Sequence, residues 1–126
     1  MTDPVSGRIT SRFGQRVHPV TTKKSFHNGI DIACKVGTPV KAPCNGEISA
    51  ISVHPTGGLS LIMLSGNLRF GFAHLSDYIP LKGQKVSEGE IIAYSGDSGK
   101  TTGPHLHFTV TKNGTLLDPL SIFYKR

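Results

Sequence analysis

Glycine and proline interrupt this sequence so often that a long helix has no room to form. The 126 residues include 15 Gly and 8 Pro, and no run of ten helix-forming residues stands between them. The intervals are instead rich in Val, Ile and Thr, which favour short strands joined by tight turns. The sequence therefore predicts an all-β fold, a compact antiparallel β-sheet or sandwich domain.

Four turn signals divide the predicted strands, and we expect each of them to close a hairpin. The segment 16–25, RVHPVTTKKS, is polar and contains a proline, so it is predicted to be a loop. Residues 1–7 are predicted to form a short, loose leader, and residues 8–126 a single domain. The four predicted hairpin turns lie at 44–46, 65–67, 88–89 and 113–114.

Charge and apolar content narrow the classes of partner. The net charge of +6 suits a polyanion such as nucleic acid, acidic lipid or bacterial cell wall. The basic residues are dispersed rather than clustered, so we expect no nucleic-acid binding. No apolar run approaches the ~20 residues of a membrane span, and the polar start has no signal-peptide core. Cys34 and Cys44 are compatible with one disulfide or with two small buried thiols.

The segment 95–108, SGDSGKTTGPHLHF, contains glycines and a Gly-Lys pair like those of a phosphate-binding loop. Such a loop needs a first glycine at position 94, which is Tyr94, and it must open onto a helix. Here it leads into the alternating pattern HLHFTV, which is typical of a strand. Nucleotide binding is therefore not expected.

In that strand His105, His107 and Thr109 share one face, and Leu106 and Phe108 lie on the other. The two imidazoles, with Cα atoms ~7 Å apart, can bind one ion together. Alternatively, one of them binds the metal while the other acts on a substrate beside it.

Three further side chains complete a candidate site. His27 and Asp31 would lie ~13 Å apart in a straight strand, too far to share an ion, so we expect a bend at Asn28 and Gly29. Asp31 stands between two isoleucines and requires a positive partner, which a cation would supply. His74 ends the apolar strand LRFGFAH, with its side chain expected on the same face as Phe70. The remaining histidines, His18 and His54, are not assigned to the metal.

The ordered motifs HNGIDIA, FAHL and TGPHLHF, together with SRFGQRVHP, GTPVKAPCNGEI and GQKVSEGEIIAYSG, resemble the LytM and lysostaphin-like zinc endopeptidases that cut peptidoglycan peptides. The resemblance covers roughly residues 8 to 118, and it implies a β domain with the zinc in a groove. It implies that His27, Asp31 and His107 bind Zn²⁺ and that His74 and His105 are catalytic. Two protein imidazoles and one carboxylate leave an open position on zinc, as in catalytic sites.

The resemblance also implies a biological setting. The expected partners are the peptide stems of bacterial peptidoglycan, the expected site of action is the cell wall, and we expect a monomer. The SRFGQRVHP motif is more similar to relatives that cut D-alanyl-diaminopimelate cross-links than to those that cut glycine bridges. Phe72 and Thr109 stand where many relatives carry Tyr and Glu. Without an export signal in the chain as given, we expect a phage or prophage lysin.

Two other functions fit parts of the sequence. A non-catalytic LytM-like module would bind and activate another wall hydrolase, but such modules usually lack the zinc ligands that are all present here. A swinging-arm carrier, related to biotinyl and lipoyl domains, would have similar hairpins, but it needs a lysine at a hairpin tip. The turns at 45–46 and 88–89 have none.

Overall fold

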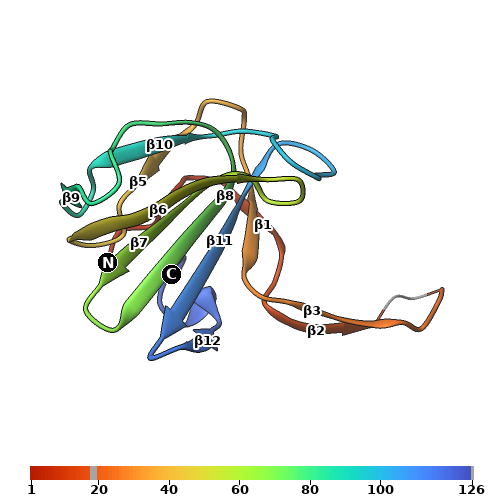
Figure 1. The fold of residues 1–126 in the computed structure, drawn as a ribbon. Helices are drawn as coiled ribbons and strands as arrows, with labels where there is room; N and C mark the ends of the chain where they lie inside the picture. Colours follow the sequence, from red (N-terminus) through yellow and green to blue (C-terminus); the bar gives the residue numbers. More distant parts are fainter. Residues whose placement is uncertain (18–19, 126) are drawn as a thin grey trace.

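The computed structural model describes residues 1–17 and 20–125, and it confirms the all-β prediction (Figure 1). Most strands form where apolar or β-branched residues stand between turn residues, and the single helical segment of the described residues is the 3₁₀ turn Pro119–Ser121. The strands are β1 Arg8–Ser11, β2 Gly14–Val17, β3 Lys24–His27, β4 Ile30–Ala33, β5 Pro39–Lys41, β6 Gly46–His54, β7 Gly58–Ser65, β8 Leu68–Tyr78, β9 Lys85–Val86, β10 Ile91–Ser95, β11 His105–Lys112 and β12 Thr115–Leu117.

Ten of these strands form one antiparallel sheet, with the order β1-β4-β11-β8-β7-β6-β9 along its main path. β10 pairs with both β5 and β8, and β12 pairs with β11. β2 and β3 pair only with each other, and Figure 1 shows their hairpin extending away from the large sheet. The neighbouring strands β4, β11 and β8 are the scaffold on which most of the candidate site is built.

One face of these strands is buried in the core. Phe70, Phe108 and Phe123 are at most 1% exposed, and Phe108 packs against Phe123 with ring centroids 5.1 Å apart. Phe70 contacts both of the other rings, at 6.1 and 6.2 Å. Because side chains alternate along a strand, the residues next to Phe70 on β8 and next to Phe108 on β11 face the opposite, open side of the sheet.

Two of the four predicted hairpins are confirmed, those at 65–67 and 113–114, which join β7 to β8 and β11 to β12. The other two predictions are wrong, because β5 pairs with β10 and β6 pairs with β9. The segments around these two turns bond to each other instead: the amide of Glu88 donates to Asn45 Oδ1 at 2.8 Å, and that of Gly89 donates to the carbonyl of Ala42 at 2.9 Å.

The predicted loop at 16–25 is also wrong, since its two ends belong to the β2–β3 hairpin. Arg16 pairs with Ser25 and Val17 with Lys24. Nearly all side chains of this hairpin are exposed, so it has no buried face to impose an alternating apolar pattern on the sequence. His18 lies outside the described residues.

The first residues of the chain are packed rather than loose. Val5 is only 3% exposed, and the carbonyl of Pro4 accepts a 2.8 Å hydrogen bond from the amide of Lys41. Cys34 and Cys44 are free thiols, so the disulfide alternative is not realised. Within the described residues, no helix has the length and apolar character needed to cross a membrane.

The phenylalanine cluster predicts a large loss of stability for Phe70→Ala. Emptying this fully buried site should lower the free energy of unfolding by about 3 to 5 kcal/mol, because both transfer energy and packing are lost. Val53→Ala, at a site that is 77% exposed, is the control and should change it by less than about 0.5 kcal/mol. Denaturant unfolding of both variants measures the difference, and equal losses would contradict this account of the core.

Candidate metal centre

A pairing between two neighbouring strands brings the first two site residues together. In the register of β4 and β11, Asp31 lies directly opposite His107. Asp31 and His107 both project from the open face, while their neighbours Ile32 and Leu106 are completely buried. The carboxylate Oδ1 of Asp31 lies 2.8 Å from His107 Nδ1.

A bend in the chain brings in the third residue. β3 ends at His27 and β4 begins at Ile30, so the chain turns at Asn28 and Gly29, as the sequence predicts. A side chain at Gly29 would collide with the backbone carbonyl of Phe108, so only glycine allows this close approach to β11. The bend brings His27 Nε2 to 3.4 Å from Asp31 Oδ1.

The three side chains form a group that fits a metal ion. One ligand atom from each of His27, Asp31 and His107 lies within 4.8 Å of the others, and all three side chains are half-buried. Zinc bonds of ~2.0–2.2 Å to imidazole nitrogen and carboxylate oxygen place tetrahedral ligand atoms ~3.3 Å apart. The separations from Asp31 to the two imidazoles, 2.8 and 3.4 Å, are close to this value.

The ring nitrogens that point away from the cluster support the same conclusion. His27 Nδ1 lies 3.0 Å from the backbone carbonyl of Arg12, and His107 Nε2 lies 2.8 Å from Asn28 Oδ1. Both oxygens are acceptors, so these nitrogens donate a proton to them. In a neutral ring the other nitrogen then carries its lone pair toward Asp31, which is how outer hydrogen bonds orient metal-binding histidines.

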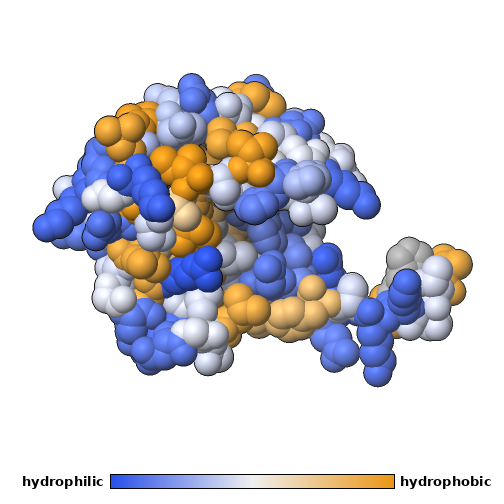
Figure 2. Space-filling model, viewed as in Figure 1, coloured by the Kyte–Doolittle hydropathy of each residue, from blue (hydrophilic) through white to orange (hydrophobic). Residues whose placement is uncertain are grey.

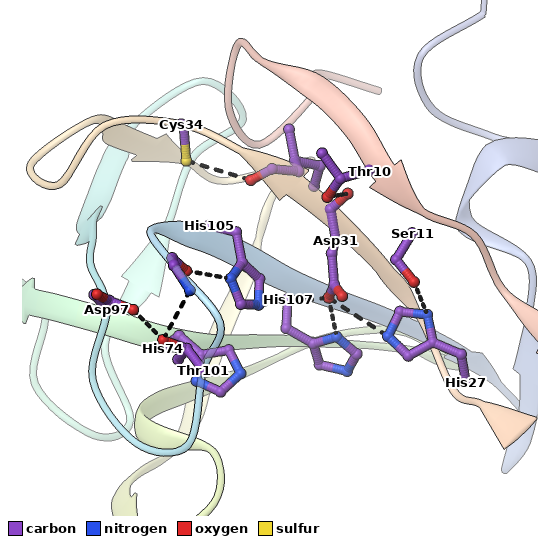
Figure 3. Close-up of polar contacts among 12 residues, drawn as sticks. Thr10, Ser11, His27, Asp31, Cys34, His74, Asp97, Thr101, His105 and His107 are labelled. Atoms are coloured by element: carbon purple, nitrogen blue, oxygen red, sulfur yellow. Dashed lines mark hydrogen bonds and ion pairs between the residues drawn. The ribbon is translucent and has the colours of Figure 1, made fainter. Parts of the chain in front are cut away.

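Two more histidines lie beside this group, as Figure 3 shows. His105 projects from the same face of β11 as His107, and its Nε2 lies 3.7 Å from Asp31 Oδ1. Its Nδ1 donates to the carbonyl of Gly103 at 2.7 Å. The ring of His74, on β8, lies 4.8 Å from that of His105. The structure thus brings all five residues predicted from the sequence into one site.

His74 reaches the site through an irregularity in β8. The sequence pattern predicts that His74 shares the face of Phe70 and Phe72, but both phenylalanines are in the core and His74 faces His105. The residue has a positive φ of 63°. β8 has an extra residue relative to β7, since Leu59 and Leu61 pair with Leu75 and Phe72. This bulge moves Leu75 into the core and turns His74 to the open face.

A pair of loops holds His74 in this conformation. Its Nδ1 donates to the carbonyl of Ser98 at 2.7 Å, and its backbone amide donates to the carbonyl of Gly57 at 2.8 Å. Ser98 is itself fixed, because its hydroxyl donates to the carbonyl of Leu75 at 2.6 Å. Nothing in the sequence marks Ser98 or Gly57 as supports of the histidine, because both act through backbone carbonyls.

The electrostatics of the site keep the carboxylate charged and one imidazole neutral. Burial raises the pKa of the Asp31 carboxyl, but the neighbouring His107, His27 and His105 outweigh burial, so the pKa is lowered. Burial lowers the pKa of His74 and, together with the neighbouring His105 and His107, outweighs the hydrogen bond to the Ser98 carbonyl, which raises it. Asp31 is therefore an anion, and His74 is a neutral imidazole with an unprotonated Nε2, at neutral pH.

Of the two histidines that the sequence leaves unassigned, His54 lies outside the metal centre. Its Nε2 contacts the hydroxyl of Ser52 at 3.0 Å on the exposed end of β6. The sequence does not identify Asn28 as a partner of His107. The only sequence signal at Asn28 is its place in the predicted bend, and that signal concerns its backbone rather than its side chain.

Comparison with known proteins places most of the chain in a described family. Residues 25–119 match Peptidase family M23. Peptidoglycan DD-endopeptidase ShyA of Vibrio cholerae is 41% identical over 109 residues, which are 85% of this chain and 25% of that protein. The chain spans about a quarter of the length of the curated relatives it matches.

Two solved structures have a similar fold. A zinc containing peptidase from Vibrio cholerae has a TM-score of 0.87 and 36% identity, over 92% of this chain and 37% of that one. The catalytic domain of the antimicrobial peptidase lysostaphin from Staphylococcus simulans has a TM-score of 0.81 and 29% identity, over 94% of this chain and 93% of that one. The second match spans nearly the whole of both chains.

The loops behind His74 predict different effects for two glycine substitutions. Gly58 and Gly66 both have left-handed φ values, 65° and 58°, so alanine at either position adds strain of about 1 to 2 kcal/mol. A Cβ at Gly58 would lie 2.5 Å from the carbonyl carbon of Ser98, whereas one at Gly66 meets nothing within 4 Å. Gly58→Ala should therefore lower stability more than Gly66→Ala and should alone shift the imidazole NMR signals of His74. Unchanged His74 signals in Gly58→Ala would contradict this support.

The two histidines of β11 should differ in their effect on metal content. His107→Ala leaves two of the three proposed ligands, so zinc per chain should fall far below one. His105→Ala keeps all three and should retain nearly stoichiometric zinc. Both variants should fold, because Leu106 and Phe108 on the other face are untouched. Metal analysis of the purified variants checks this, and zinc lost only from His105→Ala would reverse the assignment.

Proposed function

The chain belongs to peptidase family M23, and we propose that it is a zinc-dependent endopeptidase that hydrolyses peptide cross-links of bacterial peptidoglycan. The observation that carries this proposal is the arrangement of His27, Asp31 and His107 around one point, with two further histidines beside it. A purely structural zinc site would be closed by four protein ligands, whereas this group offers three.

His27, Asp31 and His107 are the proposed zinc ligands, through Nε2, the carboxylate and Nδ1 respectively. Bound zinc supplies Lewis-acid chemistry, which polarises a peptide carbonyl and lowers the pKa of water to about 7. The contacts of the two imidazoles to Arg12 and Asn28 hold the rings in the orientation that binding requires.

His74 and His105 are the proposed catalytic residues. Each donates its Nδ1 proton to a backbone carbonyl, so Nε2 is the nitrogen left for chemistry. A neutral imidazole there accepts a proton from water, and the resulting imidazolium donates it to the leaving amine or stabilises negative charge on the carbonyl oxygen. The lowered pKa of His74 keeps its ring in the accepting, neutral form at neutral pH.

The proposed bond is the D-alanyl-diaminopimelate cross-link. The relative ShyA is named a peptidoglycan DD-endopeptidase, and the SRFGQRVHP motif of this chain points to the same bond. The net charge of +6 supports a wall substrate, because a basic protein is concentrated on an anionic polymer. We place the activity at the cell wall and propose that the domain serves there as a monomer.

We further propose a role in a phage or prophage lysin. The basic surface supports it, since binding to an anionic wall favours rapid lysis. The test measures lysis of intact cells by protein added from outside and compares it with lysis of cells whose inner membrane has been permeabilised. A domain that leaves walls intact in both assays would argue against a lytic role.

Metal removal tests the main proposal. A strong chelator should abolish the release of fragments from isolated peptidoglycan, and one equivalent of zinc should restore it. Mass spectrometry of the released muropeptides then identifies the bond. Full activity in metal-free protein would refute zinc dependence, cleavage confined to glycine bridges would refute the substrate, and zinc-loaded protein that binds walls without cutting them would favour a non-catalytic module.

A further inference from the structure

The open face of the sheet continues beyond the metal centre into a cavity. It has a volume of about 400 Å³, and His107 forms one side of it. Figure 2 shows that this side of the domain is hollowed and that hydrophilic residues gather in the hollow. The lining also includes His54, Ser60, Ile62, Arg69, Gly71 and Thr109.

Alternation along β8 and β11 places these residues in a row. In the register of the two strands, His107 pairs with Ala73, Thr109 with Gly71 and Thr111 with Arg69. The intervening Phe70 and Phe72 are buried in the core. The row therefore runs along the open face from the metal centre to an arginine at its far end.

Arg69 is the one residue lining this cavity that carries a permanent charge, and no acidic residue lines it. Its direct cross-strand neighbours, Leu64 and Thr111, are uncharged. In the described part of the chain, the side chain of Arg69 is exposed and makes neither an ion pair nor a hydrogen bond. The guanidinium is available to a ligand, and its charge favours an anion.

The distance along β8 suits a peptide substrate. Arg69 is four residues from Ala73, so their Cα atoms lie ~13 Å apart. An extended peptide has nearly the same rise per residue. A substrate group about four residues from the bond at the metal centre therefore reaches the arginine. Because an arginine side chain is long, nearer positions on the peptide are also within its reach.

The lining between the two ends of the row is uncharged. Gly71 has no side chain, and a Cβ there would collide with the hydroxyl of Thr109. Thr109 is uncharged, so it does not repel an anionic ligand as a carboxylate at that position would. The hydroxyls of Thr109 and Ser60 add neutral hydrogen-bonding groups.

We propose that Arg69 forms a carboxylate-binding subsite that holds a free carboxylate of the peptide stem while the neighbouring bond lies at the metal centre. This inference rests on the proposed function and extends it to a choice between substrates. A planar guanidinium binds a carboxylate through two parallel hydrogen bonds, which fixes orientation as well as charge. Two stem groups have this chemistry: the carboxylate of diaminopimelate beside the cross-link, and that of a terminal D-alanine.

The test compares three soluble cross-linked peptide dimers: one with free carboxylates, one amidated at diaminopimelate and one amidated at the terminal D-alanine. The zinc-loaded wild type should cleave the free form with a kcat/KM about five- to tenfold above that of the dimer amidated at the bound position. Arg69→Gln should remove this preference, and Arg69→Lys should retain part of it. Arg8→Gln, an equal change of charge on β1 outside this cavity, should keep it.

Binding provides a second readout that does not depend on cleavage. The free dimer should shift the NMR signal of the Arg69 guanidinium, and the dimer amidated at the bound position should not. The amidation that lowers kcat/KM identifies which carboxylate Arg69 binds. A preference for the free dimer that survives in Arg69→Gln overturns the subsite. If no dimer is cleaved, the proposed function fails, and the NMR titration still decides whether Arg69 binds a carboxylate.

Discussion

The site depends on one backbone register, that of β4 against β11. This register places Asp31 opposite His107 on the open face and Ile32 opposite Leu106 in the core. A shift of one residue would move the carboxylate into the core and an isoleucine into the metal centre, so the apolar contacts on one face determine the chemistry on the other. The burial of Ile32 and Leu106 stabilises the fold and the ligand geometry together.

The aspartate alone could not complete this arrangement, because regular strands offer too few side chains at one point. Two departures from regularity supply the rest. The bend at Asn28 and Gly29 returns His27 to the carboxylate, and the bulge in β8 turns His74 away from the core. In both places backbone carbonyls from adjacent loops orient the imidazoles. The regular sheet provides rigidity, and its irregular points provide the functional groups.

Much of this was accessible from the sequence, and the failures share a cause. The fold class, the resemblance to lysostaphin-like peptidases and the bend before Ile30 are confirmed. They depend on local patterns that the chain carries in consecutive residues. The pairing of β5 with β10 and the β2–β3 hairpin were missed, because the first is a long-range contact and the second has no buried face. The face of His74 was predicted wrongly, because a positive φ at histidine has no local signature.

The β2–β3 hairpin has a mechanical consequence. It is outside the large sheet, yet its base pairs Gly14 with His27, so one proposed ligand is also the last residue of a projecting arm. Displacing the arm displaces an imidazole. Binding of a partner that holds the hairpin in the ion-binding position would raise the affinity for the ion. By thermodynamic reciprocity, the ion would raise the affinity for that partner by the same factor. A contact made by the exposed strands of the hairpin would therefore be coupled to the position of the His27 imidazole.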